Sequence, residues 1–282
     1  YPMPRPGKGE VLVKVRATGI CGSDVPRVLH NGAHFYPIVL GHEFSGEIVE
    51  LGVGVEGFSV GDRVAGAPLI PCFQCNHCQK GSYSLCKSYS FIGSRVQGSF
   101  AQYIKLNARN AVKMDSNVSF EQGALIEPST VALHGIRRVS YKGGKDVAVL
   151  GGGTIGLFTA QWAKIFGAKR VVVFDIDNDR PKLAERLGAD YTINTMEEGF
   201  LDKAFEITKG EGFDYIFETA GAEPTIKMVF ELAGNNSSAC LIGTPTRELH
   251  FSPQLFEMLL RREFFLTGSW MSYSAPFPGE EW

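Results

Sequence analysis

The chain has 282 residues and a mass of 30.8 kDa, enough for one large domain or two ordinary ones. Its formal net charge of −2 and its pI near 6.4 argue against electrostatic binding to nucleic acid or a membrane surface. No apolar run reaches the roughly 18 residues of a membrane helix. Four of the six cysteines lie between Cys72 and Cys86, and this clustering favours metal over disulfides and indicates a cytoplasmic protein.

The first third of the sequence is predicted to form short strands and turns. Residues 11–17 alternate in their second half as a half-buried strand does, and residues 47–51 read as the next strand. Residues 61–64 indicate a turn that enters another strand. We therefore expect a β-rich unit with few helices.

From Ser119 onward the pattern changes. Ser119 and Gln122 form a capping-box pattern that opens a short helix, predicted to stop near Glu127-Pro128, and a second helical pattern passes through His134. Beyond residue 143, short apolar runs alternate with amphipathic helices. The runs are 147–150, 171–175, 191–193, 215–218, 239–242 and 264–268.

The helices between these runs carry the expected end signals. Glycines follow some of them (Gly167, Gly188, Gly234), and prolines stand early in others (Pro181, Pro224, Pro253). Alternation of strands and helices predicts an α/β fold with a parallel, doubly wound sheet, and the domain boundary is predicted within residues 128–140.

A glycine motif follows the apolar run 147–150. Gly151-Gly152-Gly153-Thr154-Ile155-Gly156 fits G-x-G-x-x-G, with a strand before it and a helix after it. Such glycines allow a tight turn, and the free N–H groups of the helix can bind a pyrophosphate. The alternative is a glycine-rich turn without a ligand.

The next strand ends in an acid about 20 residues later, Asp175. Its carboxylate can accept hydrogen bonds from an adenosine ribose and would repel a 2′-phosphate, which favours NAD over NADP. Arg180 leaves NADP as an alternative, because a guanidinium could bind the 2′-phosphate. We expect Arg180 beside Asp175 at the ribose, or on a solvated helix face.

The four clustered cysteines, Cys72, Cys75, Cys78 and Cys86, have the spacing C-x2-C-x2-C-x7-C. Four thiolates on one short lobe suit a closed tetrahedral zinc site of the structural kind. An iron–sulfur run more often has a shorter last gap followed by proline, whereas Lys87 follows here. Disulfides are the other alternative.

Cys21, His42 and Glu127 are the remaining candidates for a second metal site. A thiolate, an imidazole and a carboxylate leave one position open for water or substrate, as catalytic zinc requires. Each also has a structural reading: a core cysteine, a hydrogen-bonded histidine and a helix-ending Glu-Pro. If residues 42 and 43 are fully extended, their side chains point to opposite faces, so ligation by both His42 and Glu43 needs a bend near Gly41.

Several motifs, in their order along essentially the whole chain, resemble the zinc-dependent medium-chain dehydrogenase/reductase superfamily. They are Gly19-Ile20-Cys21-Gly22-Ser23-Asp24, Gly41-His42-Glu43-Phe44-Ser45-Gly46, the four-cysteine lobe and residues 151–156. Within it the chain is most similar to the polyol-phosphate branch, in residues 21–27, 31–34, 91–95, 126–128 and 268–271. Sorbitol dehydrogenases share the zinc motifs but match these stretches less well.

The resemblance implies a GroES-like zinc-binding catalytic domain (1–130), a Rossmann NAD-binding domain (131–272) and a return towards the catalytic domain (273–282), with the active site in the cleft between the domains. It implies two zinc ions per chain. The catalytic one would be held by Cys21, His42 and Glu127, with Glu43 as a further or alternating ligand. Ser23 would receive the substrate proton. Where many alcohol dehydrogenases continue the proton relay with a histidine, this chain has Pro26, and water is the expected substitute.

A phosphorylated substrate would need a cation, and the candidates are Arg95, Arg27 and His34. The leading hypothesis is thus a zinc-dependent oxidoreductase that oxidises a secondary alcohol of a polyol phosphate with NAD, as a cytoplasmic homodimer or homotetramer without nucleic-acid or membrane partners. The alternatives are a sorbitol or other unphosphorylated polyol dehydrogenase, and a non-catalytic zinc-bearing protein of the same fold. Members of the superfamily extend beyond both ends of this chain, so the 282 residues alone are expected to be poorly soluble or inactive.

Overall fold

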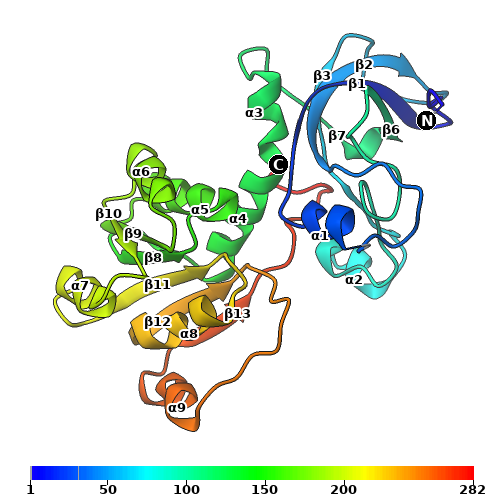
Figure 1. Cartoon of the computed structure of the whole chain (residues 1–282). Helices are drawn as coiled ribbons and strands as arrows, with labels where there is room; N and C mark the ends of the chain where they lie inside the picture. Colours follow the sequence, from blue (N-terminus) through cyan, green and yellow to red (C-terminus); the bar gives the residue numbers. More distant parts are fainter. Residues whose placement is uncertain (1, 31) are drawn as a thin grey trace. The chain divides into compact units, whose positions relative to one another are not determined.

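The computed structural model describes residues 2–30 and 32–282, and Asn31, in one of the stretches that carry the resemblance, lies outside them. The chain divides into two compact units. Figure 1 labels the helices and strands. Unit 1 is Tyr1–Thr130 together with Ser272–Trp282, and unit 2 is Val131–Met271. Among the described residues, every helix is too short or too polar to cross a bilayer.

Unit 1 is built on an antiparallel sheet with the strand order β6-β1-β2-β3-β7, beside a short antiparallel pair, β4-β5. The strands are β1 (Glu10–Gly19), β2 (Glu43–Leu51), β3 (Arg63–Gly66), β4 (Leu69–Ile70), β5 (Ser90–Phe91), β6 (Tyr103–Asn107) and β7 (Ala111–Lys113). Alternate residues of these strands, such as Val11 and Val13 of β1, fill one apolar core.

The helical elements of unit 1 are short. They are α1 (Asp24–Leu29), α2 (Asn76–Gln79), α3 (Phe120–Ala124) and the 3₁₀ turns η1 (Tyr83–Leu85) and η2 (Ala108–Asn110). The capping box predicted at the start of α3 is confirmed, since the Ser119 side chain accepts the Gln122 N–H and the Gln122 side chain accepts the Ser119 N–H.

The predicted helix end at Glu127-Pro128 is wrong. α4 (Ile126–Arg138) begins one residue before Glu127 and continues from unit 1 into unit 2. Pro128 lies in its first turn, where a backbone N–H has no partner within the helix and proline is therefore tolerated. Glu127 thus lies in the first turn of a helix and does not end one.

Unit 2 contains the predicted parallel sheet, with the order β10-β9-β8-β11-β12-β13. Its strands are β8 (Asp146–Leu150), β9 (Arg170–Asp175), β10 (Tyr191–Asn194), β11 (Phe213–Glu218), β12 (Ala233–Leu241) and β13 (Phe265–Gly268). Its helices, besides the rest of α4, are α5 (Thr154–Ile165), α6 (Asp179–Arg186), α7 (Phe200–Ile207), α8 (Glu223–Leu232) and α9 (Pro253–Arg261).

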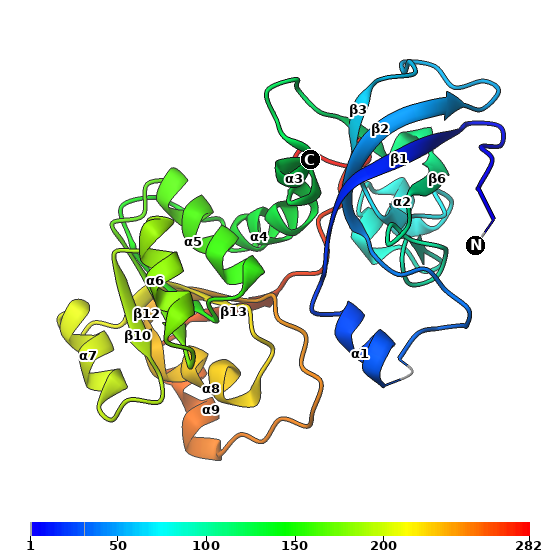
Figure 2. The ribbon, with the colours of Figure 1, turned by 45° about the horizontal axis from the view of Figure 1, so that its top comes forward.

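The helices of unit 2 cover both faces of the sheet (Figures 1 and 2). α4, α5 and α6 pack on the face that receives Val147 and Val149, whereas α7, α8 and α9 pack on the face that receives Ala148 and Leu150. The expected doubly wound α/β arrangement is confirmed. Gly234 departs from its predicted role as a helix end, because α8 ends at Leu232 and Gly234 lies within β12.

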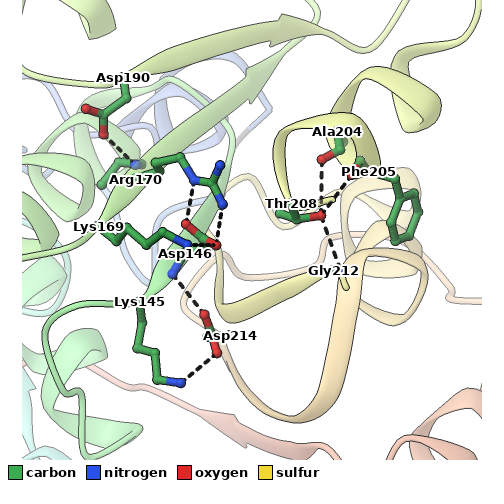
Figure 3. A network of polar contacts seen from close by, with 11 residues as sticks. Lys145, Asp146, Lys169, Arg170, Asp190, Ala204, Phe205, Thr208, Gly212 and Asp214 are labelled. Carbon is green, nitrogen blue, oxygen red and sulfur yellow. Dashed lines mark hydrogen bonds and ion pairs between the residues drawn. The ribbon is translucent and has the colours of Figure 1, made fainter. Parts of the chain in front are cut away.

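A network of charges joins the amino-terminal ends of β8, β9 and β11 (Figure 3). The Arg170 guanidinium donates two hydrogen bonds of 2.7 Å to the Asp146 carboxylate, and Lys169 adds a third contact of 3.3 Å. Asp214 accepts the backbone N–H of Asp146 at 2.9 Å and lies 3.1 Å from the Lys145 ammonium. The network fixes the ends of the strands opposite to the glycine motif.

Candidate active site and metal centres

Cys21, His42 and Glu43 come together at the end of β1 and the start of β2. Their ligand atoms all lie within 4.8 Å of one another. Two glycines make this possible. Gly41 has a φ of +90°, which supplies the bend that lets consecutive side chains face one place. Gly19 is paired with Glu43 across the sheet, and a Cβ there would collide with the Glu43 carboxylate.

A further acid, Asp24, supports this group from the start of α1. It is 1% exposed, and its Oδ2 atom accepts the Cys21 N–H at 3.1 Å. Its Oδ1 atom lies 3.6 Å from His42 Nδ1, which finds no hydrogen-bond partner among the described residues. The Arg27 guanidinium contacts the same Asp24 oxygen at 3.3 Å. Sequence reasoning did not assign Asp24, although its place three residues after Cys21 was a usable signal.

Burial disfavours the ionised forms of the clustered groups. It raises the pKa of the Cys21 thiol to about 11 and that of the Glu43 carboxyl to about 7. It also lowers the pKa of His42, which keeps the imidazole neutral and able to act as a ligand. A bound cation would stabilise both anions, so the donor set fits a divalent metal.

Glu127, at the start of α4, is buried but does not belong to the close group of Cys21, His42 and Glu43. Burial and, secondarily, the charges of Glu43 and Asp24 raise its pKa to about 8. Its charge in turn raises the pKa of Cys21, which indicates that the carboxyl faces the same region. The structure therefore places Glu43, the less certain of the predicted ligands, nearer to Cys21 and His42 than Glu127.

The four-cysteine lobe is compact. Sγ atoms of Cys72 and Cys78 are 3.9 Å apart, and those of Cys75 and Cys78 are 3.6 Å apart. Four sulfurs at about 2.3 Å from a tetrahedral zinc would be separated by about 3.8 Å. The backbone N–H of Cys78 helps to lower the pKa of Cys75 to about 6. The lobe thus has the sulfur spacing of a closed zinc site.

The glycine motif forms the tight turn between β8 and α5. Gly151 has a φ of +103°, and the next glycine, Gly152, donates its N–H to Asp175 Oδ2 at 2.6 Å. Gly153 is the N-cap of α5, and Thr154, Ile155 and Gly156 form its first turn. The first N–H groups of α5 therefore remain available to an anion.

Asp175 and Arg180 meet at this turn. Arg180 Nη1 lies 3.4 Å from Asp175 Oδ2, and the Arg180 side chain is 55% exposed. The Asp177 N–H donates to the other oxygen, Asp175 Oδ1, at 2.9 Å. The buried carboxylate is thus fixed in direction, while the guanidinium beside it stays accessible.

The remaining predicted residues differ in their surroundings. Ser23 is exposed, and its Oγ atom accepts a hydrogen bond of 2.9 Å from Arg27 Nη1. Arg95 is exposed and stacked over Tyr89, with its guanidinium carbon 4.7 Å from the ring centroid. His34 is exposed. The structure brings Ser23 and Arg27 together but does not group Arg95 or His34 with them.

Two family profiles match the chain. The family described as "Alcohol dehydrogenase GroES-like domain" matches residues 7–116, and the one described as "Zinc-binding dehydrogenase" matches residues 154–281.

Two curated relatives and two solved structures illustrate the similarity. Galactitol 1-phosphate 5-dehydrogenase of Escherichia coli K12 is 44% identical over 273 residues, which cover 97% of this chain and 79% of the relative. A crystal structure of galactitol-1-phosphate dehydrogenase from Escherichia coli has a TM-score of 0.95 at 42% identity, over 100% of this chain and 82% of that one. Sorbitol dehydrogenase of Halalkalibacterium halodurans is 37% identical, over 95% of this chain and 78% of the relative. A zinc-binding dehydrogenase from Sinorhizobium meliloti, solved with NADP, has a TM-score of 0.91 at 33% identity. The match covers 98% of this chain and 80% of that one.

Proposed function

Because the chain belongs to the zinc-binding dehydrogenases with an alcohol dehydrogenase GroES-like domain, we propose that it oxidises galactitol 1-phosphate to tagatose 6-phosphate with NAD. The convergence of Cys21, His42 and Glu43 on one place is the observation that carries the proposal. The 44% identity to galactitol 1-phosphate 5-dehydrogenase supports the choice of substrate.

Cys21, His42 and Glu43 would hold the catalytic zinc, with Glu127 as the further or alternating carboxylate. This exchanges the roles first expected for the two glutamates, because only Glu43 lies within the close group. When bound, zinc supplies a Lewis acid that acidifies a substrate hydroxyl. Cys72, Cys75, Cys78 and Cys86 would hold a second, structural zinc.

Ser23 is the proposed proton acceptor. Its oxygen already accepts a hydrogen bond from Arg27, so its own hydroxyl proton is free to be passed on while the substrate proton arrives. Arg27 also contacts Asp24, and a guanidinium offers only hydrogen-bond donors and no acceptor. Arg27 therefore orients Ser23 without taking the proton, and the exit route leads from Ser23 to water.

Asp175 supports NAD as the cofactor. Its carboxylate is held at the glycine turn, where a 2′-phosphate would be repelled. The exposed Arg180 beside it supports some use of NADP, with which one relative was solved. The ratio of kcat/KM for the two cofactors decides this, and a preference for NADP would contradict the proposal.

Two measurements test the function itself. Cys21→Ser should abolish NADH formation, and unchanged NADH formation would refute catalytic zinc and favour a non-catalytic protein of this fold. Turnover of galactitol 1-phosphate should exceed that of free galactitol and sorbitol. Equal rates would remove the phosphate from the proposal and favour the sorbitol dehydrogenase alternative, which the 37% identity to that enzyme supports.

A homodimer or homotetramer is the proposed assembly. β13 is an edge strand of the sheet in unit 2, and Phe265 on it is 56% exposed. On the adjoining α9, Phe256 and Leu260 are 50% and 69% exposed. Edge strands and apolar patches of this kind support self-association. Phe265→Asp should yield monomers by size-exclusion chromatography with light scattering. A cytoplasmic location is proposed because a thiolate site of four cysteines requires reducing conditions.

A further inference from the structure

Glu218, the last residue of β11, is a fully buried acid that the proposed chemistry does not use. It is 0% exposed, and burial raises its pKa. Its Oε2 atom has no hydrogen-bond partner among the described residues. Acids are almost never fully buried without a specific partner, because removing the carboxyl group from water is unfavourable. The contacts of the Oε1 atom indicate why the buried Glu218 side chain is tolerated.

The Oε1 atom of Glu218 gathers the donors of the turn that follows β11. It accepts the backbone N–H of Ala220 at 2.9 Å and that of Gly221 at 2.8 Å. The Thr225 hydroxyl, in the first turn of α8, lies 2.7 Å from the same oxygen. One buried oxygen therefore fixes the path of residues 219–221.

This turn packs directly against the first glycine of the dinucleotide motif. The Thr219 N–H donates to the Leu150 carbonyl at 2.9 Å, and the Thr219 hydroxyl lies 3.1 Å from the Gly151 carbonyl oxygen. A Cβ on Gly151 would approach Thr219 Oγ1 to 3.0 Å and the Ala220 Cβ to 3.1 Å. The position of the turn after β11 thus sets the position of the turn after β8.

We propose that Glu218 is a positioning residue of the dinucleotide site. By holding residues 219–221 through Oε1, it keeps the loop that begins at Gly151 in the conformation that presents the free N–H groups of α5 to the pyrophosphate. The inference rests on the proposed dinucleotide cofactor but not on the substrate or on either metal.

Removal of the acceptor has a specific consequence. Two backbone N–H groups, those of Ala220 and Gly221, would lose their partner, and the turn would have to rearrange to satisfy them. Its other side offers no space, because a Cβ on Gly221 would collide with the backbone of Thr244. Movement would therefore be directed towards Gly151, and dinucleotide affinity would fall.

Four variants separate this role from general stability. Glu218→Leu removes the acceptor at similar size, and Glu218→Asp withdraws it by one methylene. Glu218→Gln keeps an acceptor at the Oε1 position. Asp146→Asn is a matched control, because Asp146, labelled in Figure 3, is also a buried acid of this sheet and is 7% exposed. It begins β8, at the end opposite to the glycine motif.

The dissociation constant of NADH is measured without substrate by the fluorescence of the bound nicotinamide, and melting temperatures are recorded in parallel. Glu218→Leu and Glu218→Asp should weaken NADH binding by roughly tenfold or more, the effect of one or two lost hydrogen bonds. Glu218→Gln and Asp146→Asn should stay within about threefold of the unsubstituted chain, although Asp146→Asn lowers the melting temperature. In turnover, Glu218→Asp should raise KM for NAD and change kcat by less than about twofold.

Unchanged NADH binding in Glu218→Leu would overturn the inference, as would a loss in Asp146→Asn as large as that in Glu218→Leu. If Glu218→Leu does not fold, unchanged NADH binding in Glu218→Asp would overturn the inference instead. Failure of the unsubstituted chain to bind either NADH or NADPH would overturn the cofactor assignment first, and the inference with it.

Discussion

His42 Nδ1 lies 3.6 Å from Asp24 Oδ1, and both side chains are almost fully buried. With Nδ1 directed at a carboxylate, we infer that Nε2 is the nitrogen offered to the metal. A carboxylate behind a ligating imidazole fixes its tautomer and its orientation. Asp24 also accepts the N–H of Cys21, so one acid supports two proposed ligands.

Asp24→Asn should therefore weaken metal binding at this site by about 10- to 100-fold, the usual effect of losing such a partner. The affinity is measured by competition with a chromophoric chelator after the chain has been freed of metal. Glu47→Gln is the control, because Glu47 forms only a surface ion pair with Arg16. Equal affinity in Asp24→Asn and Glu47→Gln would refute the supporting role of Asp24.

The four-cysteine lobe should depend on its own metal. Cys86 is 5% exposed, and Cys86→Ser removes one of the four sulfurs. The zinc content should fall from two ions to one per chain, and proteolysis between β4 and β5 should accelerate, because such a site contributes on the order of 10 kcal/mol to local folding. Cys240→Ala, in the core of unit 2, should keep both ions. Retention of both zinc ions by the Cys86→Ser variant would contradict the assignment of a zinc site to the four-cysteine lobe.

Stability in acid should depend on Asp146. Hydrogen bonds from Arg170, followed by those from Lys169, lower its pKa. A carboxyl whose pKa is lower in the folded state contributes stability that is present above its unfolded pKa and is lost as the pH falls through its folded pKa.

Asp146→Asn should consequently reduce the free energy of unfolding by about 1.5–3 kcal/mol at neutral pH, the range for hydrogen bonds to charged groups. The difference should shrink below about pH 4, where the acid of the unfolded chain is protonated. Urea denaturation followed by circular dichroism at several pH values measures it. Asp179→Asn, whose side chain is 90% exposed, should have no effect at any pH. A difference that does not change with pH would contradict the charge argument.

We propose Arg95 as the cation for the substrate phosphate. Its backbone N–H donates to the Phe91 carbonyl at 2.9 Å, and the Phe91 ring meets the His42 ring at a centroid distance of 5.5 Å. Arg95→Ala should lower kcat/KM for galactitol 1-phosphate by roughly tenfold or more and leave that for galactitol unchanged. Arg109→Ala is the matched control, because Arg109 is also exposed and stacked on an aromatic ring, that of Phe73. Equal losses on both substrates would rule out phosphate binding by Arg95.

The sequence by itself determined the features whose parts are neighbours in the chain. The glycine motif from Gly151 to Gly156 and the lobe from Cys72 to Cys86 depend on local turns, so their spacing was sufficient to predict them. The parallel sheet of unit 2 followed from alternating strands and helices, because each element buries its own apolar face.

The tertiary structure alone decided which glutamate accompanies Cys21 and His42. Glu43 reaches them because the antiparallel register of β1 and β2 sets it opposite Gly19, whose missing side chain leaves room for the carboxylate. The positive φ of Gly41 then turns His42 to the same place. Neither the register nor the backbone angle can be read from the sequence, because both are set by the packing of strands that are distant in the chain.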